Sequence, residues 1–383
     1  MYKKKRIVIT GVGIVSPFGT GKRVFWSSIK NGRSGICKIK GFETRGFPCK
    51  MGGEVPETVL RRHIGKDVSK HVSRATKFGL IASKLALKDA GSIYPVSNKK
   101  RSLYGLSLGI SIGNISGITA LDKEILKKGP RFISPSAFPN VCPNASASHI
   151  SMAANITGFS ITLSAPSTSG LDAISSACRM IQKYGYSTIL AGATEDLSWD
   201  SYETLSALKC MSKLIPGEGA CLYVLESLAS ARRRKAKIYA EIKGYGTSFD
   251  PKEREGLSSN TESIYRAMKM AVEDSGHSPR KVNYVLGSSN SAKSCDQRET
   301  RAAKRLFGTH GGAIPVISIK SMTGETFSAS GPFNIAAAIM AIRTNFIPGV
   351  SNYKARGKKI NNVMINSTSG NGFNSSIIVG SVD

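Results

Sequence analysis

Two short segments combine residues that could do chemistry with glycine and serine. Residues 320–331, KSMTGETFSASG, are typical of a loop that presents one side chain to a reactive centre, and that side chain is the carboxylate of Glu325. In STSGLDAI, Ser167 comes just before a helical pattern. A serine hydroxyl is a poor nucleophile unless a base accepts its proton.

Two glycine-rich segments resemble phosphate-binding loops but lack the residues that such loops need. GVGIVS, at 11–16, has no third glycine and runs into Pro17, which would block a helix start. GEGA, at 217–220, lacks the Gly-Lys-Ser/Thr end of a phosphate loop, and a tight turn is the better prediction. The seven cysteines are scattered without any C-x-x-C spacing. We therefore expect no cofactor and no metal, and we expect reduced thiols in a cytoplasmic protein.

The composition indicates a folded protein with a large core. The chain has 383 residues, of which 40% are hydrophobic and 21% are charged. No run approaches the roughly 18 apolar residues that a membrane span needs. The N-terminus passes from lysines directly into a strand-like stretch. Neither a membrane span nor a signal peptide is therefore expected.

The formal net charge of +29 raises the possibility of a nucleic-acid partner. The basic residues form short clusters along the chain, for example at 99–101, 232–235 and 354–359. No helix-turn-helix, zinc-finger or RNP-like signature accompanies them. A solvated basic surface is the preferred interpretation and an acidic partner protein is the next. A nucleic-acid-binding protein remains an alternative supported by charge alone.

Short β-branched runs alternate with longer segments of helical period, which predicts an α/β fold with buried strands. Strands are expected at 5–15, 103–114, 187–195, 220–227, 237–246, 282–290, 313–319 and 361–370, and helices at 75–91, 170–185 and 261–276. The strand at 237–246 resembles the opening strand in its apolar alternation and glycine ending. We therefore predict two similar halves, 1–225 and 226–383.

The motifs taken in order resemble the β-ketoacyl-acyl-carrier-protein synthases of the thiolase fold. The resemblance runs from Arg6 to about Gly380 through RIVITGVGIVSPFG, GPRFISPSAFPN, SAPSTSGLDAI, GEGACLYVLE, KIYAEIKGYG, NYVLGSSN, SIKSMTGETFSASG and NSTSGNGFNSSIIVG. It implies a five-layered αβαβα sandwich of two similar halves, usually dimeric. It also implies a nucleophilic cysteine at a helix start and two histidines that bind the thioester oxygen.

The three positions implied by the resemblance carry other residues. Ser167 stands in the cysteine's place, Ser288 in the place of the first histidine and Glu325 in the place of the second. The five histidines fall in none of these motifs, and they are His63, His71, His149, His277 and His310. Losing one oxyanion donor costs roughly 10²- to 10³-fold in rate. We therefore expect no condensing activity from the chain alone. An alternative is an acyltransferase or thioesterase with Ser167 as nucleophile and Glu325 as base, although a carboxylate is a weak base for serine.

Two residues of the family pattern are kept and two features are changed. Lys320 of the second histidine motif and Glu299 after the first are present, and a buried structural ion pair is their expected role. The segment 207–216 is shorter than in typical members, and Gly370 occupies the position of the gating phenylalanine.

The family includes chain-length factors, ketosynthase-like subunits that lack the active cysteine and pair with an active ketosynthase. The chain is similar to these in its losses, although they often carry glutamine where this chain carries Ser167. The resemblance implies an active homologue (heterodimer) or a second copy (homodimer) as partner, in fatty-acid or polyketide synthesis. The resemblance also implies that residues 136–165 form the helix and strand that pair the two subunits, with an ordinary core helix and strand as the alternative.

The resemblance also implies an acidic acyl carrier protein as a partner, bound by basic residues. Lys70, Arg74 and Lys77 are spaced to share a helix face, and Arg131 lies in GPRFISP. We therefore expect carrier-protein docking at Lys70, Arg74 and Arg131, with a merely solvated face as an equal alternative for Lys77.

Overall fold

The helices predicted at 75–91, 170–185 and 261–276 are present, and a glycine follows each of them. The computed structural model describes residues 4–65, 72–91, 96–212, 214–252, 261–288, 293–308, 314–348 and 359–382, without the side chains of 212 and 293–296. The predicted helices form as α4 (Arg74–Asp89), α7 (Ser169–Tyr184) and α10 (Glu262–Ser275). Gly91, Gly185 and Gly276 follow them with φ of 70°, 78° and 66°. Glycine adopts this left-handed conformation at a helix C-terminus without a Cβ clash.

Further helices are α1 (Lys22–Lys30), α2 (Glu57–His63), α5 (Ile115–Lys128), α6 (Ala145–Ala154), α8 (Trp199–Ala207), α9 (Leu228–Arg233), α11 (Lys293–Phe307), α12 (Lys320–Thr323) and α13 (Ser330–Thr344). The main sheet contains β1 (Ile7–Ser16), β2 (Gly19–Thr20), β5 (Tyr104–Ile110), β6 (Ser160–Ser164), β7 (Thr188–Glu195), β8 (Gly219–Ser227), β9 (Ala240–Phe249), β10 (Tyr284–Leu286), β11 (Val316–Ile317), β12 (Asn362–Thr368) and β13 (Phe373–Gly380). The short strands β3 (Cys37–Lys38) and β4 (Met51–Gly52) pair separately.

The main sheet repeats one arrangement twice. In the first half the order is β1-β8-β7-β5-β6, with two antiparallel pairs followed by two parallel pairs. In the second half the order is β9-β13-β12-β10-β11, again with two antiparallel pairs followed by two parallel pairs. Strands β1, β5, β6, β7 and β8 thus correspond to β9, β10, β11, β12 and β13. The halves meet where β1 pairs with β9. This duplication confirms the prediction of two similar halves, while the boundary at 225/226 stays a prediction.

The glycines of the opening GVG motif serve helix packing. A Cβ on Gly11 or Gly13 would lie 2.2 or 1.9 Å from a carbonyl oxygen of α4. In the second half, a Cβ on Gly244 or Gly246 would lie 2.3 Å from a carbonyl oxygen of α10. Only glycine allows so close an approach of strand to helix. The same spacing at the same place in both halves accounts for the motif without a cofactor.

The prediction of a tight turn at GEGA is wrong. Gly217 forms an isolated β-bridge with Gly53, and Gly219 begins β8 with a φ of 149°. The segment therefore pairs with neighbouring chain and does not form a tight turn.

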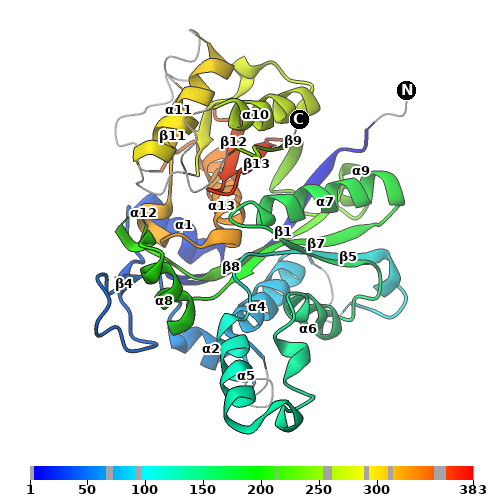
Figure 1. Ribbon diagram of the computed structural model, residues 1–383. Coiled ribbons are helices and arrows are strands. Elements are labelled where there is room, and N and C mark those ends of the chain that lie inside the picture. Colours follow the sequence, from blue (N-terminus) through cyan, green and yellow to red (C-terminus); the bar gives the residue numbers. More distant parts are fainter. Residues whose placement is uncertain are drawn as a thin grey trace.

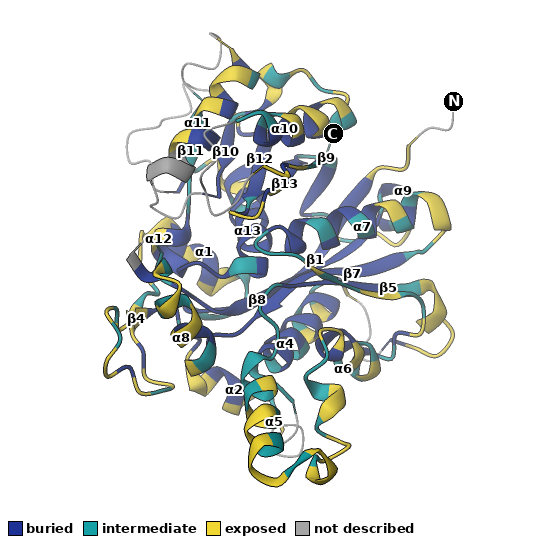
Figure 2. Cartoon of the chain, in the orientation of Figure 1, coloured by how far each residue is buried: buried dark blue, intermediate teal, exposed yellow. Residues whose placement is uncertain are grey.

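Helices and sheet halves stack in five layers (Figure 1). Helices α7 and α13 pack together between the two sheet halves, α4 and α6 cover the outer face of the first half, and α10 and α11 cover the second. Burial matches these layers, because the central helices and both sheet halves are mostly buried and are dark blue in Figure 2. This is the thiolase-like fold that the resemblance implied.

Candidate functional site

Ser167 lies at the N-terminal end of α7, as predicted. It is half-buried and directly precedes Thr168, the N-cap residue. Its carbonyl oxygen accepts a hydrogen bond of 2.7 Å from Ser367 Oγ. Within the described part of the chain, its hydroxyl has no hydrogen-bonding partner. Ser167 therefore has the position of a nucleophile without a base to activate it.

Ser288 follows β10 and is held from two sides. Its backbone N–H donates to the Glu299 carboxylate at 2.9 Å, and Glu299 also accepts from Asn366 Nδ2 at 3.0 Å. Its hydroxyl accepts a hydrogen bond of 3.1 Å from the backbone N–H of Thr368. Because Ser367 contacts Ser167 and the next residue contacts Ser288, β12 joins the two positions.

Lys320 and Glu325 form a buried ion pair. Lys320 Nζ lies 2.6 Å from Glu325 Oε2, and the side chains are 6% and 4% exposed. The ammonium also donates to the carbonyl oxygen of Ser288 at 2.7 Å. The expectation that Lys320 pairs with Glu299 is therefore wrong, because the loop returns Glu325 to the lysine while Glu299 binds the backbone of Ser288.

The other carboxylate oxygen of Glu325 organises its own loop. It accepts the backbone N–H of Phe327 and the hydroxyl of Ser330, each at 2.9 Å. Phe327 has a φ of 45°, a left-handed conformation that is uncommon for a bulky residue. These contacts hold the strained turn in place, so the carboxylate is engaged in structure on both of its oxygens.

The three sequence-predicted positions thus belong to one hydrogen-bonded network that draws residues from both halves. It runs from Ser167 through Ser367 and Thr368 to Ser288, and from there to Lys320 and Glu325. Among the described histidines, His63 contacts Thr20 and His149 contacts Asn140, both outside the network. Glu325 faces an ammonium and not the Ser167 hydroxyl, which leaves the network without a proton acceptor for Ser167.

Glu195, which ends β7, belongs to no motif of the sequence but lies against the same loop. Its fully buried carboxylate accepts Ser328 Oγ at 2.7 Å and the backbone N–H groups of Ser111, Ile112 and Gly113 at 2.8–3.2 Å. Burial raises the pKa of Glu195 to about 7, although the hydrogen bonds from these donors act to lower it. Glu195 therefore ties the loop after β5 to η7 (Phe327–Ala329). The only sequence signal was an acid at the end of an apolar strand.

Gly370, the position of the family's gate, lies exposed at the tip between β12 and β13. A Cβ built there meets nothing within 4 Å. The glycine is therefore not required by packing, and its assignment to the gate position stays a prediction.

The predicted docking residues have different surroundings. Lys70 lies outside the described residues. Arg74 binds the buried carboxylate of Glu218 at 2.7 Å, Glu57 at 2.9 Å and a backbone carbonyl. These contacts assign Arg74 a structural role and argue against docking. Arg131, in η2 (Pro130–Phe132), is exposed and stays a docking prediction.

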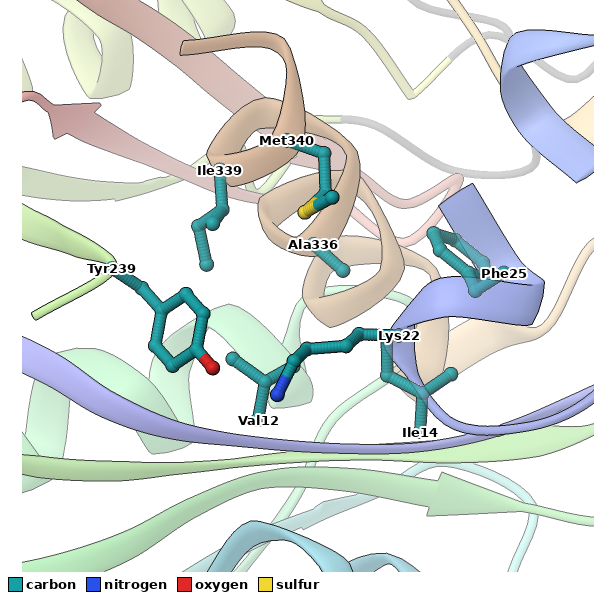
Figure 3. Close-up of a pocket in the computed structure, with 8 residues that line it drawn as sticks. All are labelled: Val12, Ile14, Lys22, Phe25, Tyr239, Ala336, Ile339 and Met340. Atoms are coloured by element: carbon teal, nitrogen blue, oxygen red, sulfur yellow. The ribbon is translucent and has the colours of Figure 1, made fainter. Parts of the chain in front are cut away.

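A small apolar void lies between β1, α1 and α13 (Figure 3). Val12 and Ile14 of β1 face Ala336 and Ile339 of α13 across it, while the Lys22 chain extends toward Tyr239. The volume is about 10 Å³, room for one water-sized group. It cannot hold an acyl chain and is a packing gap.

Other features bear on the sequence predictions. The six cysteines that are described are free thiols, and no helix in the described ranges is long and apolar enough to cross a membrane. The same residues contain no group of three or more His, Cys, Asp or Glu side chains that could hold a metal ion.

Family models and curated relatives all identify the same protein family. The model of the beta-ketoacyl synthase N-terminal domain matches residues 4–231, and that of the C-terminal domain matches residues 239–354. The 3-oxoacyl-[acyl-carrier-protein] synthase 2 of Coxiella burnetii is 30% identical, with 99% of each chain covered. The synthase of the same name from Staphylococcus aureus strain N315 is 29% identical over 90% of this chain and 87% of its own.

Solved structures give the same fold. The ishigamide ketosynthase/chain length factor superimposes with a TM-score of 0.87 at 24% identity over the full length of both chains. A type II PKS ketosynthase, in complex with its acyl-carrier protein, superimposes with a TM-score of 0.85 at 24% identity over 99% of this chain and 100% of that one.

Proposed function

Because the chain belongs to the β-ketoacyl synthase family, we propose that it is a ketosynthase-like subunit that has lost its own condensing activity. It serves fatty-acid or polyketide synthesis by pairing with a catalytically intact relative, as a chain-length factor does. The observation that carries this proposal is the buried Lys320–Glu325 ion pair at the position of the family's second histidine.

The ion pair makes condensation by this site unfavourable. A condensing site needs hydrogen-bond donors aimed at the negative charge that develops on the thioester oxygen. Glu325 is an acceptor, and its two oxygens already bind Lys320, Phe327 and Ser330. The same contacts weaken the alternative of a Ser167-dependent acyltransferase or thioesterase, because Glu325 does not hydrogen-bond to Ser167.

The surface around residues 115–161 supports a partner subunit. Although α5 carries five isoleucines and leucines, none of its residues is buried. Leu126, Phe132, Phe138 and Met152 are 85%, 67%, 61% and 68% exposed. Strand β6 forms the edge of the sheet beside them. Exposed apolar area and an unpaired strand edge together are typical of an interface that another chain covers.

Activity assays test the loss of condensation. The purified chain should release no carbon dioxide above background from malonyl-carrier protein and should form no acyl adduct from acyl-carrier protein. An intact Cys-His-His ketosynthase from the same host is the positive control. Intact-protein mass spectrometry that finds an acyl group on Ser167 would contradict the proposal.

Co-expression tests the partner role. The chain should co-purify with the intact ketosynthase as one complex, and Phe132→Asp with Phe138→Asp should reduce its yield. Tyr184→Asp, at a 68% exposed aromatic residue on α7, is the matched control and should leave the complex intact. A chain that stays monomeric at micromolar concentration and binds no ketosynthase would overturn this role.

A further inference from the structure

Two of the basic clusters in the sequence, 99–101 and 232–235, come together at one hollow of the fold. A cup of about 430 Å³ lies between the segment before β5 and helix α9. Its walls include Lys100 from the first cluster and Arg233 and Arg234 from the second. Thr188, which begins β7, also lines the cup, whereas Glu195 of the candidate site ends that strand. The cup is therefore about 23 Å away from the site along the strand.

Among the described residues, the one acidic side chain in the lining of the cup is neutralised by an arginine of the same lining. Glu226, the acid in its lining, is almost fully buried and accepts hydrogen bonds from Arg234 at 2.5 Å and from Thr10 at 2.6 Å. Arg234 also donates to the carbonyl oxygen of Ala90 at 2.7 Å, so its guanidinium is satisfied by the protein. This pair leaves no net negative charge in the cup.

Two cations remain at the rim. Lys100 and Arg233 are exposed, and neither has a hydrogen-bond or ion-pair partner among the described residues. The hydroxyls of Ser97 and Ser230 lie on the same walls, and Val96 and Leu103 supply apolar surface. Two free cations beside hydroxyl donors in a hollow of this size suit a small polyanion with an apolar or sugar portion.

We propose that this cup binds a phosphate-bearing small molecule. Arg233 provides a planar set of N–H donors for phosphate oxygens, and Lys100 provides a mobile point charge opposite. A ligand held between them would bridge the residues that start β5 and β7 and end β8, and so would stabilise the first half of the sheet. None of the cup's lining residues belongs to the network of Ser167, Ser288 and Glu325.

Pyrophosphate is the probe for this proposal. It should raise the melting temperature of the wild-type chain at constant ionic strength, because a ligand that binds only the folded state stabilises it. Calorimetric titration should show that Lys100→Glu with Arg233→Glu weakens binding by about tenfold or more. Arg301→Glu with Lys304→Glu, at exposed positions of α11, makes the same change in net charge and should alter the affinity by less than about twofold.

Three results would overturn the proposal. One is the absence of any pyrophosphate binding by the wild type at millimolar concentration. A second is equal weakening by the two double variants, which would attribute binding to overall charge. The third is equal affinity for citrate and pyrophosphate at matched ionic strength, which would identify a general polyanion surface. Because all four substituted side chains are exposed, the variants should keep the wild-type circular dichroism spectrum, and Lys100→Arg should retain binding.

Discussion

The ammonium of Lys320 lies 2.6 Å from the carboxylate of Glu325, and the protein interior surrounds both groups. The lysine has one other acceptor, the carbonyl oxygen of Ser288. The glutamate has two other donors, from Phe327 and Ser330. Removing one member of such a pair leaves an uncompensated buried charge, whereas apolar replacement of both is tolerated far better.

Glu325→Leu and Lys320→Met should each lower the free energy of unfolding by about 3–5 kcal/mol. The double variant Lys320→Met/Glu325→Leu should be more stable than either single variant. Urea denaturation of all four proteins gives the coupling energy. Glu124→Gln breaks the surface pair with Lys128 and should cost less than about 0.5 kcal/mol. Additive losses in the double variant would show that the two charges do not depend on each other.

Restoring the family's residues should therefore fail. Ser167→Cys/Ser288→His/Glu325→His removes the counter-charge of Lys320 and the acceptor that holds the Phe327 turn. We expect a triple variant with a lower melting temperature than wild type and no carbon dioxide release above background. Ser167→Cys/Ser288→His, which keeps Glu325, is the control and should retain more of the stability. A triple variant that is both stable and active would contradict the structural role of Glu325.

The sequence predicted which residues lie at the site but not which of them form the ion pair. Motif order brought Ser167, Ser288 and Glu325 to one network, and the helical period located three helices. The partner of Lys320 depends on how the loop folds back over five residues, which no periodicity encodes. Helix α13 was missed because its sequence is apolar on all sides and has no amphipathic period. Arg74 was misassigned because its partner Glu218 is 144 residues away.

Buried carboxyl groups should make stability depend on pH. Burial, with the nearby charges of Glu218 and Glu195, raises the pKa of Asp196 to about 8. An unfolded aspartate titrates near 3.9, so between about pH 4 and pH 8 the folded state holds a proton that the unfolded state lacks. Stability contributed by this group therefore falls as pH rises.

Asp196→Asn should remove this loss. Relative to wild type, the variant should gain roughly 2–4 kcal/mol between about pH 5 and pH 8, because one pKa unit corresponds to about 1.4 kcal/mol. Urea denaturation at closely spaced pH values gives the difference curve. A difference that stays constant over this range would mean that Asp196 does not carry the proton.

The void in Figure 3 offers room for one extra methyl-sized group. Val12→Ile adds one methylene at its wall and should raise the free energy of unfolding by about 0.5–1 kcal/mol. Val224→Ile is the matched control, since Val224 is fully buried on β8 away from the void, and overpacking there should cost about 1–3 kcal/mol. If Val12→Ile destabilises as much as the control, the gap is closed by side-chain motion in solution.

Arg131 is a predicted docking residue for an acidic carrier protein. It is exposed, whereas Arg74 is held by Glu218 and Glu57. Attraction between opposite charges at a surface mainly raises the association rate and weakens with salt. We therefore expect carrier-protein binding, by the chain or by its complex with an intact ketosynthase, to fall steeply between low and physiological ionic strength.

Charge reversal separates a docking residue from overall charge. Arg131→Glu should lower the association rate measured by surface plasmon resonance by about three- to tenfold at low salt, and the loss should shrink as salt is added. Lys304→Glu makes the same change in net charge on α11 and should change the rate by much less, because α11 lies far from α5, the helix that precedes Arg131 in the chain (Figure 1). Equal losses from the two variants would attribute recruitment to the total charge of +29 and would remove Arg131 from the docking site.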